Sequence, residues 1–450
     1  MNICILGRQG KLALAELEQC FGAERVQPIG DEYALVDAAI NIDHLGGTVK
    51  VAKLLTTLDT TNPQKVFDYC RKQLPKYASE YPEGKVQLGV SLYGLDMPLA
   101  KVNANVLSLK KAVKQTGRSV RAVPNTTAAL SSAQTYHNHM AGPMGMELVF
   151  VRYGKQTLLG QITGVQNIDA YAARDQARPK TDAFVGMLPP KLAQMMINMS
   201  GITNTAQISE PFFKKTKSEV QPDTLLPGAK SVSAQNGLLE KMVAEDGQNP
   251  TEAQPEAASE NSVGEKAKDL RILDPFCGTG VVLQEAALLG FDVYGTDLSE
   301  KMVDYSGVNL KWLVEKFDLN TYVDIHHGDA IETSWQPPID AVVAETYLGQ
   351  PFSAPPAPDK LSKVRRICNE IISRFLLNLA PQIGSNTVLC LAVPAWRSDS
   401  GRVTHLPLVT ELEKLGYARV SLVHAASSEL LYYREDQVVA RELLILRKIK

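Results

Sequence analysis

Apolar and polar positions follow two different patterns along the second half of the chain. Short apolar runs, typical of buried strands, alternate with longer stretches that place an apolar residue every three or four positions, which is typical of helices. The pattern predicts strands at 271–275, 291–296, 322–326, 341–344 and 387–393, and helices at 281–289, 300–317, 360–380 and 406–415. This order of elements predicts an α/β fold with a parallel sheet covered by helices on both faces.

Two further apolar runs, at 418–424 and 440–446, end the chain. The residues between them are too few for the helical crossover that parallel neighbours need. We therefore expect the sheet to end in an antiparallel hairpin.

The first half of the chain has a looser layout of short strands and amphipathic helices. Strands are expected at 2–6 and 33–36 around a helix at 11–21. Further on, the pattern predicts helices at 63–73 and 99–115, and strands at 86–92, near 120 and at 146–153. We interpret these segments as two small α+β units.

A change of composition separates residues 214–268 from the rest of the chain. This segment is rich in Ser, Gln, Asn, Glu, Pro and Ala, and such a sequence buries too little apolar surface to offset its ordering entropy. We predict a disordered acidic insertion. Eight acidic residues and three lysines lie between 240 and 269, so the remainder is positively charged although the whole chain has a net charge of −2. A positive remainder is compatible with an RNA partner.

The bulk composition narrows the class of protein. A chain of 450 residues with 44% hydrophobic content can form about two or three domains. The first residues lack the pattern of a secretory signal, and no apolar run is long enough to span a membrane. The six cysteines include no C-x-x-C pair. We expect a cytoplasmic protein with reduced thiols, no metal site and no membrane partner.

The strongest chemical signal is the sequence D-P-F-C-G-T-G. It follows the first strand of the second half and begins the next helix, and its glycines let a nucleotide-like cofactor approach the backbone. The residues are Asp274, Pro275, Phe276, Cys277, Gly278, Thr279 and Gly280. Asp297 ends the following strand, where a carboxylate can accept the ribose hydroxyls of a nucleotide, or alternatively cap the next helix.

This motif resembles motif I of S-adenosylmethionine-dependent methyltransferases that act on exocyclic amines of nucleic-acid bases. Upstream lie R-D-x-x-R-P, at 174–179, and G-M-L-P-P-K-L-A, at 186–193. Together the three motifs resemble the tRNA guanosine-N2 methyltransferases that carry an N-terminal THUMP RNA-binding domain. The resemblance implies that Asp329, in a Gly-Asp pair that could equally form a turn, holds the adenine. It also implies that the segment with Met187, Pro189 and Lys191 lines the cofactor pocket, although the prolines could simply start a helix.

The resemblance gives the expected division of the chain. It comprises a ferredoxin-like unit (1–58), a THUMP-like RNA-binding domain (59–168), a joining segment (169–213), the acidic insertion (214–268) and a Rossmann-like methyltransferase domain (269–450). Phosphate contacts in the THUMP-like unit are expected from a basic helix and the residues after it, although a solvated basic face is an alternative. These residues are Lys110, Lys111, Lys114, Arg118 and Arg121.

The end of the fourth strand departs from the family. Related enzymes usually have [D/N]-P-P-[Y/F] there, whereas this chain has Glu345, Thr346, Tyr347 and Leu348. We expect Glu345 and the Thr346 carbonyl to accept the protons of the target amine, and Tyr347 to stack on the flipped base.

These observations predict an S-adenosylmethionine-dependent enzyme that methylates the N2 amine of a guanosine in tRNA. Two alternatives remain open at this point. One is a methyltransferase for another nucleic-acid amine, in rRNA or in DNA adenine or cytosine. The other is an RNA-binding protein that has lost catalysis, which the missing prolines suggest.

Overall fold

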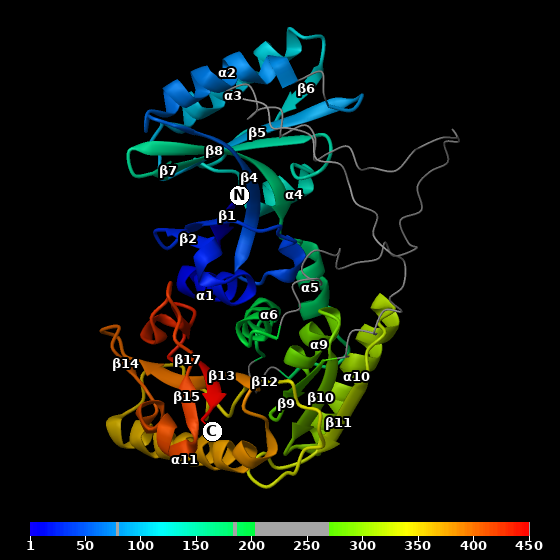
Figure 1. Cartoon of the computed structure of the whole chain (residues 1–450), viewed down its shortest axis with the longest axis vertical. Helices are drawn as coiled ribbons and strands as arrows, with labels where there is room; N and C mark the ends of the chain where they lie inside the picture. The colour runs from blue at the N-terminus through cyan, green and yellow to red at the C-terminus, as the bar shows by residue number, and fades with distance from the viewer. Residues whose placement is uncertain (78–80, 183–186, 203–269, 450) are drawn as a thin grey trace, which may run out of the picture.

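The computed structural model describes residues 1–77, 81–182, 187–202 and 270–449. The predicted insertion at 214–268 lies outside the described residues. Two α/β halves are stacked along the long axis of the molecule, and helices α1 (Gly10–Phe21) and α6 (Pro190–Met199) lie between them (Figure 1).

The C-terminal half is built on a sheet that is parallel except at one edge. Its main path runs in the order β11-β10-β9-β12-β13-β17-β15. The strands are β9 (Arg271–Asp274), β10 (Asp292–Asp297), β11 (Val323–His327), β12 (Ala341–Glu345), β13 (Val388–Arg397), β15 (Tyr417–Arg419) and β17 (Val439–Lys448). Strand β17 pairs antiparallel with both β13 and β15. The predicted Rossmann-like α/β fold and its antiparallel ending are therefore confirmed.

Alternating residues of the central strands enter two separate cores. Ala341 and Val343 of β12 pack into the cluster that contains α6 and α9 (Val281–Leu288). Their neighbours Val342 and Ala344 pack into the cluster that contains α11 (Pro358–Leu379). Since successive side chains of a strand point to opposite faces, the sheet is covered on both sides, as its continuous apolar strands require. Helix α10 (Glu300–Phe317) lies on the α9 face.

Two predictions near the C-terminus are wrong. Residues 406–415 do not form an α-helix but two 3₁₀ turns, at Pro407–Thr410 and Leu412–Leu415, because Glu411 between them has a non-helical backbone (φ −123°). The predicted strand 418–424 ends at Arg419. The reason is that the N–H groups of Val423 and His424 donate to the Glu18 carboxylate of α1, at 2.7 and 2.9 Å, instead of joining the sheet.

The N-terminal half contains one sheet of eight strands in the order β2-β3-β1-β4-β8-β7-β5-β6. They are β1 (Asn2–Leu6), β2 (Val26–Ile29), β3 (Tyr33–Val36), β4 (Thr48–Leu58), β5 (Lys85–Tyr93), β6 (Ser119–Ala122), β7 (Gly145–Tyr153) and β8 (Gln156–Val165). The sequence pattern did not predict β2, β4 or β8. Strands β4 and β8 pair antiparallel, so the two predicted α+β units share a continuous sheet.

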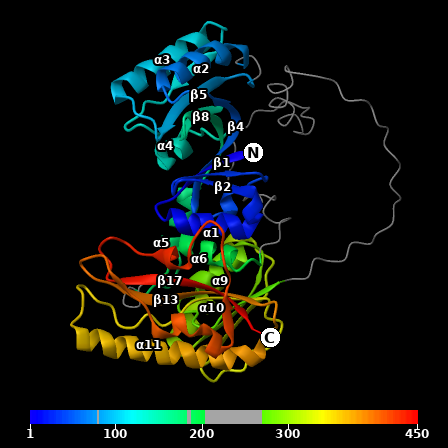
Figure 2. The ribbon, with the colours of Figure 1, turned by 60° about the vertical axis from the view of Figure 1, so that its left-hand side comes forward.

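Three helices cover the outer part of this sheet or its loops. They are α2 (Pro63–Tyr77), α3 (Leu99–Lys114) and α4 (Ser132–His137), and α2 and α3 lie together at the end of the molecule far from the C-terminal sheet (Figures 1 and 2). Helix α5 (Ile168–Gln176) then leads toward α6 and the C-terminal half. All six cysteines lie among the described residues, where they are buried and form no disulfide.

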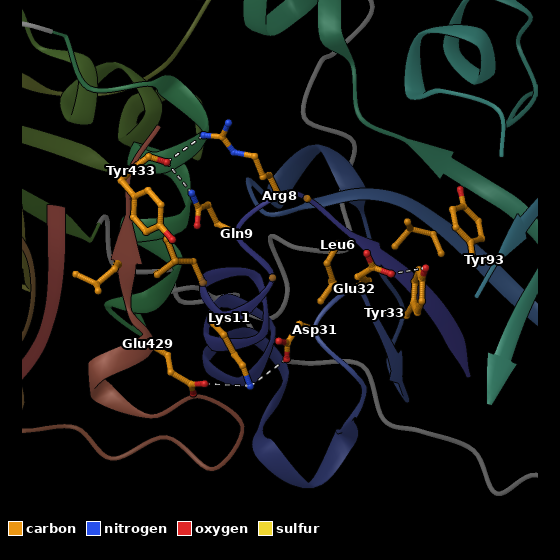
Figure 3. Close-up of a pocket in the computed structure, with 15 residues that line it drawn as sticks. Leu6, Arg8, Gln9, Lys11, Asp31, Glu32, Tyr33, Tyr93, Glu429 and Tyr433 are labelled. Atoms are coloured by element: carbon orange, nitrogen blue, oxygen red, sulfur yellow. Dashed lines mark hydrogen bonds and ion pairs between the residues drawn. The ribbon is translucent and has the colours of Figure 1, made fainter. Parts of the chain in front are cut away.

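Hydrogen bonds and apolar packing connect the two halves. Leu12 and Ala15 of α1 share a core cluster with α6 and α9. Arg8 and Gln9 donate to the Tyr433 carbonyl at 3.0 and 2.9 Å, beside a cavity of about 720 Å³ (Figure 3). Three carboxylates and two cationic side chains line this cavity, so its charge does not favour a phosphate group. No residue of the D-P-F-C-G-T-G motif lines it. These contacts hold the N-terminal half against the C-terminal half.

Candidate active site at the carboxyl edge of the parallel sheet

The D-P-F-C-G-T-G segment forms a tight turn between β9 and α9. Gly278 and Gly280 have positive φ angles of 51° and 81°, which side-chain-bearing residues rarely adopt. A Cβ on Gly280 would lie 2.3 Å from the Ser306 hydroxyl, so the turn must pass close to α10. A Cβ on Gly278 would meet no other residue closer than 4.0 Å. Gly278 therefore leaves open space beside the backbone, which suits the close approach of a ligand.

The rest of the motif secures this turn. The Cys277 N–H donates to the Thr296 carbonyl at 3.0 Å. The Phe276 ring packs edge-on against that of Phe375 of α11, with the two ring centres 5.1 Å apart. Pro275 is buried. Helix α9 has no side-chain cap at its N-terminus, where Gly280 is the N-cap residue. Its first N–H groups and the positive end of its dipole are therefore available to an anionic ligand group.

Asp297 at the end of β10 connects its strand to the motif turn. One carboxylate oxygen accepts from the Gly278 N–H and the other from the Ser299 N–H, both at 2.9 Å. The N-cap residue of α10 is Ser299, so Asp297 does not fill the alternative role of helix cap. Each oxygen keeps acceptor capacity for a further donor. The next residue, Leu298, is 66% exposed, and an apolar side chain so placed can cover a flat ring. Sequence reasoning missed Leu298, since a single apolar residue after an acid carries no pattern.

Three carboxylates gather at the ends of β9, β10 and β12. Asp274 is only 2% exposed, and burial raises its pKa well above the usual range. The Phe276 N–H opposes this rise in the pKa, whereas the charges of Asp297 and Glu345 add to it. A cationic ligand group placed among the three would favour their charged forms, since opposite charges lower carboxyl pKa values.

Asp329 follows β11 and forms a turn. Its carboxylate accepts from the Ile331 N–H at 3.1 Å, and its carbonyl accepts from the Thr333 N–H and hydroxyl at 2.8 and 2.7 Å. The alternative of turn chemistry thus describes its contacts in the structure. A role for Asp329 in adenine binding stays a prediction.

The end of β12 is fixed by contacts with the adjacent strand β13 and with β17, the strand beyond it. The N–H and hydroxyl of Thr346 both donate to the Ala392 carbonyl of β13, each at 3.0 Å. The Arg441 guanidinium of β17 donates to one oxygen of the Glu345 carboxylate. Burial raises the pKa of Glu345, and Arg441 acts in the opposite direction. Tyr347 is 45% exposed, so its ring is available to a partner. Sequence reasoning missed Arg441, which is 96 residues from Glu345.

The segment before α6 lies beside the motif helix. Leu188 is buried in the same cluster as Cys277 and Val281, and Pro190 occupies the first turn of α6 with Pro189 as its N-cap residue. Met187 is partly exposed. The Lys191 ammonium instead donates to Gln166 of the N-terminal half and lies 5.0 Å from the Tyr171 ring centre. A direct role of Lys191 toward a cofactor stays a prediction.

The R-D-x-x-R-P segment anchors α5 to the motif helix. Arg174 makes two hydrogen bonds to Glu285 of α9, at 2.8 and 3.1 Å, and both side chains are buried. Arg178 pairs with Asp175 at 2.5 Å. Sequence reasoning missed Glu285, an acid inside an otherwise apolar helix and thus a signal of a buried partner.

The five predicted RNA-contacting residues lie on α3, in the loop after it and on β6, at the end of the molecule opposite α9 (Figure 1). Lys111, Lys114 and Arg121 are exposed and Lys110 is partly exposed. Arg118 donates to the carbonyls of Tyr81 and Pro82, so part of its guanidinium supports a loop. The exposed cations can reach a polyanion without breaking internal contacts.

The strand order and the glycine turn before α9 define a Rossmann-like α/β domain in the C-terminal half. Residues 261–334 match a family model described as "RMKL-like, methyltransferase domain", which confirms the prediction from the D-P-F-C-G-T-G motif. None of the helices in the described part of the chain has the length and hydrophobicity needed to cross a bilayer.

Two curated relatives are tRNA (guanine(10)-N2)-dimethyltransferases. That of Methanothermobacter thermautotrophicus is 33% identical over 134 residues, which are 30% of this chain and 35% of the relative. That of Pyrococcus abyssi is 37% identical over 83 residues, 18% of this chain and 21% of the relative. The matched segments thus span about a third and a fifth of these two proteins. Within these matched segments, the resemblance to tRNA guanosine-N2 methyltransferases is confirmed.

Two solved structures align over the whole chain. TrmN from Thermus thermophilus has a TM-score of 0.48 at 14% identity and is covered to 99%. A possible methylase from Clostridium difficile 630 has a TM-score of 0.44 at 11% identity and is covered to 98%.

Proposed function

We propose that this protein is an S-adenosylmethionine-dependent methyltransferase that acts on the N2 amine of a guanosine in tRNA. The observation that carries the proposal is the position of Glu345, a fixed carboxylate at the same sheet edge as the motif I turn. The sequence similarity to two tRNA guanine-N2 dimethyltransferases supports guanine as the base and tRNA as the substrate class.

The residues at the sheet edge fit S-adenosylmethionine. Gly278 leaves the backbone open, Gly280 lets the turn pass close to α10, and the uncapped N-terminus of α9 suits the carboxylate of the methionine part. Asp297 has the acceptor capacity to hold the ribose hydroxyls, and Leu298 can cover one face of the adenine. The three nearby carboxylates suit a cation. When bound, the cofactor supplies a methyl group on a positively charged sulfur.

The chain's own residues then orient the acceptor amine. The nitrogen lone pair of a guanine N2 amine is delocalised into the ring, so its protons must be held and the nitrogen aimed along the sulfur–methyl axis. One N–H of the amine donates a hydrogen bond to Glu345, and the other N–H donates to the Thr346 carbonyl. Tyr347 stacks on the base after it has been flipped out of its helix. Glu345 can also take the proton that the amine loses after transfer.

The N-terminal half captures the RNA in this proposal. Lys110, Lys111, Lys114 and Arg121 contact phosphates, as expected for A-form RNA, which is recognised largely by shape and backbone. Arg118 supports the loop at Tyr81 and Pro82 and adds charge. A tRNA substrate places the protein in the cytoplasm.

The alternative of a lapsed enzyme is disfavoured by the contacts at the end of β12. A proline pair would restrict the backbone there, and two hydrogen bonds from Thr346 to Ala392 provide an equivalent restraint. The end of β12 therefore keeps a fixed backbone without the prolines.

Methyl transfer into unmodified tRNA tests the proposal. The full chain is mixed with tritiated S-adenosylmethionine and, in separate reactions, bulk unmodified tRNA, rRNA and DNA, and the products are digested and resolved as nucleosides. We expect N2-methylguanosine from tRNA and its loss in Glu345→Gln, whereas Glu315→Gln on the exposed face of α10 serves as the matched control. Label in rRNA or DNA alone would favour the other amine methyltransferases. No label in any acceptor would favour the non-catalytic RNA-binding protein.

A further inference from the structure

Arg441 forms a buried ion pair with the carboxylate that we assign to the target amine. It lies on β17, two strands from β12, and its side chain is almost fully buried. On the strand between them, Ala392 faces Glu345 and Pro394 faces Arg441. Residues 392 and 394 lie on the same face of β13, since side chains two apart share a face. The small side chain of Ala392 thus lets Arg441 reach across β13 to Glu345.

We propose that Arg441 is a positioning residue for methyl transfer: it holds one oxygen of Glu345 and keeps this carboxylate ionised, so that the other oxygen accepts the target amine. This inference rests on the proposed function. Arg441 itself contacts neither base nor methyl group in the proposal and acts through Glu345 alone.

The surroundings of Glu345 explain why such a partner is needed. Burial disfavours the charged carboxylate, and Asp274 on β9 is a second buried acidic group close to it. On β13, the opposing residue Ala392 carries no charge. Arg441 is therefore the cation that offsets this burial, and its interaction opposes the rise in the pKa of Glu345. A protonated Glu345 would offer a donor where the amine needs an acceptor.

The hydrogen bond from Arg441 also replaces a geometric restraint. A glutamate has one more side-chain torsion than an aspartate, so an unrestrained Glu345 would lose more rotamer freedom when it binds the amine. The bond to Nε of Arg441 fixes the carboxylate before the base arrives. The longer acid is thereby preorganised without the prolines that are usual in related enzymes.

A neighbouring pair supplies a matched control. Glu442 follows Arg441 on β17 and its side chain lies on the opposite face of the sheet, where Arg419 of β15 donates to it at 3.0 Å. Arg419→Met therefore removes a comparable arginine–glutamate pair from the same sheet without touching Glu345.

The test compares Arg441→Met, Arg441→Lys and Arg419→Met. Single-turnover methylation of tRNA is measured against pH with saturating cofactor. We expect Arg441→Met to lower the rate at neutral pH by about 10-fold or more and to move the acidic limb of the profile to higher pH, since Glu345 then protonates more easily. Arg441→Lys restores the charge and should move the limb back toward that of the wild type. Arg419→Met should keep the wild-type profile.

A double variant tests whether Arg441 acts only through Glu345. If it does, Glu345→Gln combined with Arg441→Met is no slower than Glu345→Gln alone. The proposal would be overturned if the two losses of rate multiplied in the double variant, or if the acidic limb of the pH profile were unchanged in Arg441→Met.

A measurement without RNA separates this inference from the proposed function. In protein labelled with ¹³C at the glutamate carboxyl carbons, the Glu345 signal is identified by its loss in Glu345→Gln. Its pKa should be higher in Arg441→Met than in the wild type and unchanged in Arg419→Met. Equal pKa values in wild type and Arg441→Met would overturn the inference, whereas a wild type that methylates no acceptor would overturn the proposed function.

Discussion

Asp297→Ala should greatly weaken the binding of S-adenosylmethionine. The proposed ribose contacts are two hydrogen bonds to a charged acceptor, each worth about 1.5–3 kcal/mol. Losing both gives about 3–6 kcal/mol, or about 10²- to 10⁴-fold in Kd. The substitution also removes the hydrogen bond that the Gly278 N–H donates to Asp297 at 2.9 Å, so the motif turn is held to β10 less firmly, by the bond from the Cys277 N–H to the Thr296 carbonyl. Isothermal titration of the cofactor into the full chain measures the effect.

Two comparisons separate the ribose contacts from general damage. Asp292→Asn changes an acid on the same strand that accepts a backbone N–H, from Tyr322 at 2.7 Å, but at the opposite strand end. We expect it to bind the cofactor as the wild type does. Thermal unfolding without cofactor reports any loss of stability in Asp297→Ala. An Asp297→Ala protein that folds and binds with wild-type affinity would refute the assignment of Asp297 to the ribose.

Three further predictions concern the anchoring of α5, the base and the RNA. Arg174→Met should destabilise the fold by about 3–5 kcal/mol in denaturant unfolding, because it removes the cation that pairs with the buried Glu285. Adding Glu285→Leu should recover most of that loss, so equal stability of the single and double variants would contradict the prediction. Tyr347→Ala should weaken capture of the base by about 1–3 kcal/mol in single-turnover titrations with tRNA while leaving cofactor affinity and melting temperature unchanged, so a loss of cofactor affinity would place Tyr347 elsewhere. Lys111→Glu with Lys114→Glu should lower tRNA affinity and flatten its salt dependence, whereas Lys363→Glu on α11 should not; equal salt slopes would remove α3 from the RNA surface.

The parallel sheet could be predicted because its strands are buried on both faces. The strand around Val343 is apolar without interruption up to Glu345, and the run around Ile272 is interrupted by Arg271 alone and ends at Asp274, so each strand ends in an acid that marks the carboxyl edge. The motif turn and Asp297 followed from the same local signals. All of this information lies within a few residues of each position.

Strands β4 and β8 were missed because their sequences conceal their burial. Lys50 interrupts the apolar pattern of β4, yet it is only 2% exposed and bonds to the equally buried Glu147 at 2.7 Å. Gly160 and Gly164 weaken the signal of β8, because glycine is depleted in strands. Arg441 was missed for a different reason: only the folded sheet brings it to Glu345. Contacts between strands that are distant in sequence leave no local pattern.

The shared N-terminal sheet determines where this chain can be divided into fragments. The predicted boundary between residues 58 and 59 falls at the end of β4, whose ladder to β8 spans nearly its full length. A fragment that starts at residue 59 would expose the edge of β8, and an unpaired edge invites association with other chains. A fragment that ends at residue 58 would have the same defect on β4. Biochemists who wish to isolate the N-terminal half and test its proposed RNA binding should therefore retain residues 1–165 as one piece and expect aggregation from either shorter fragment.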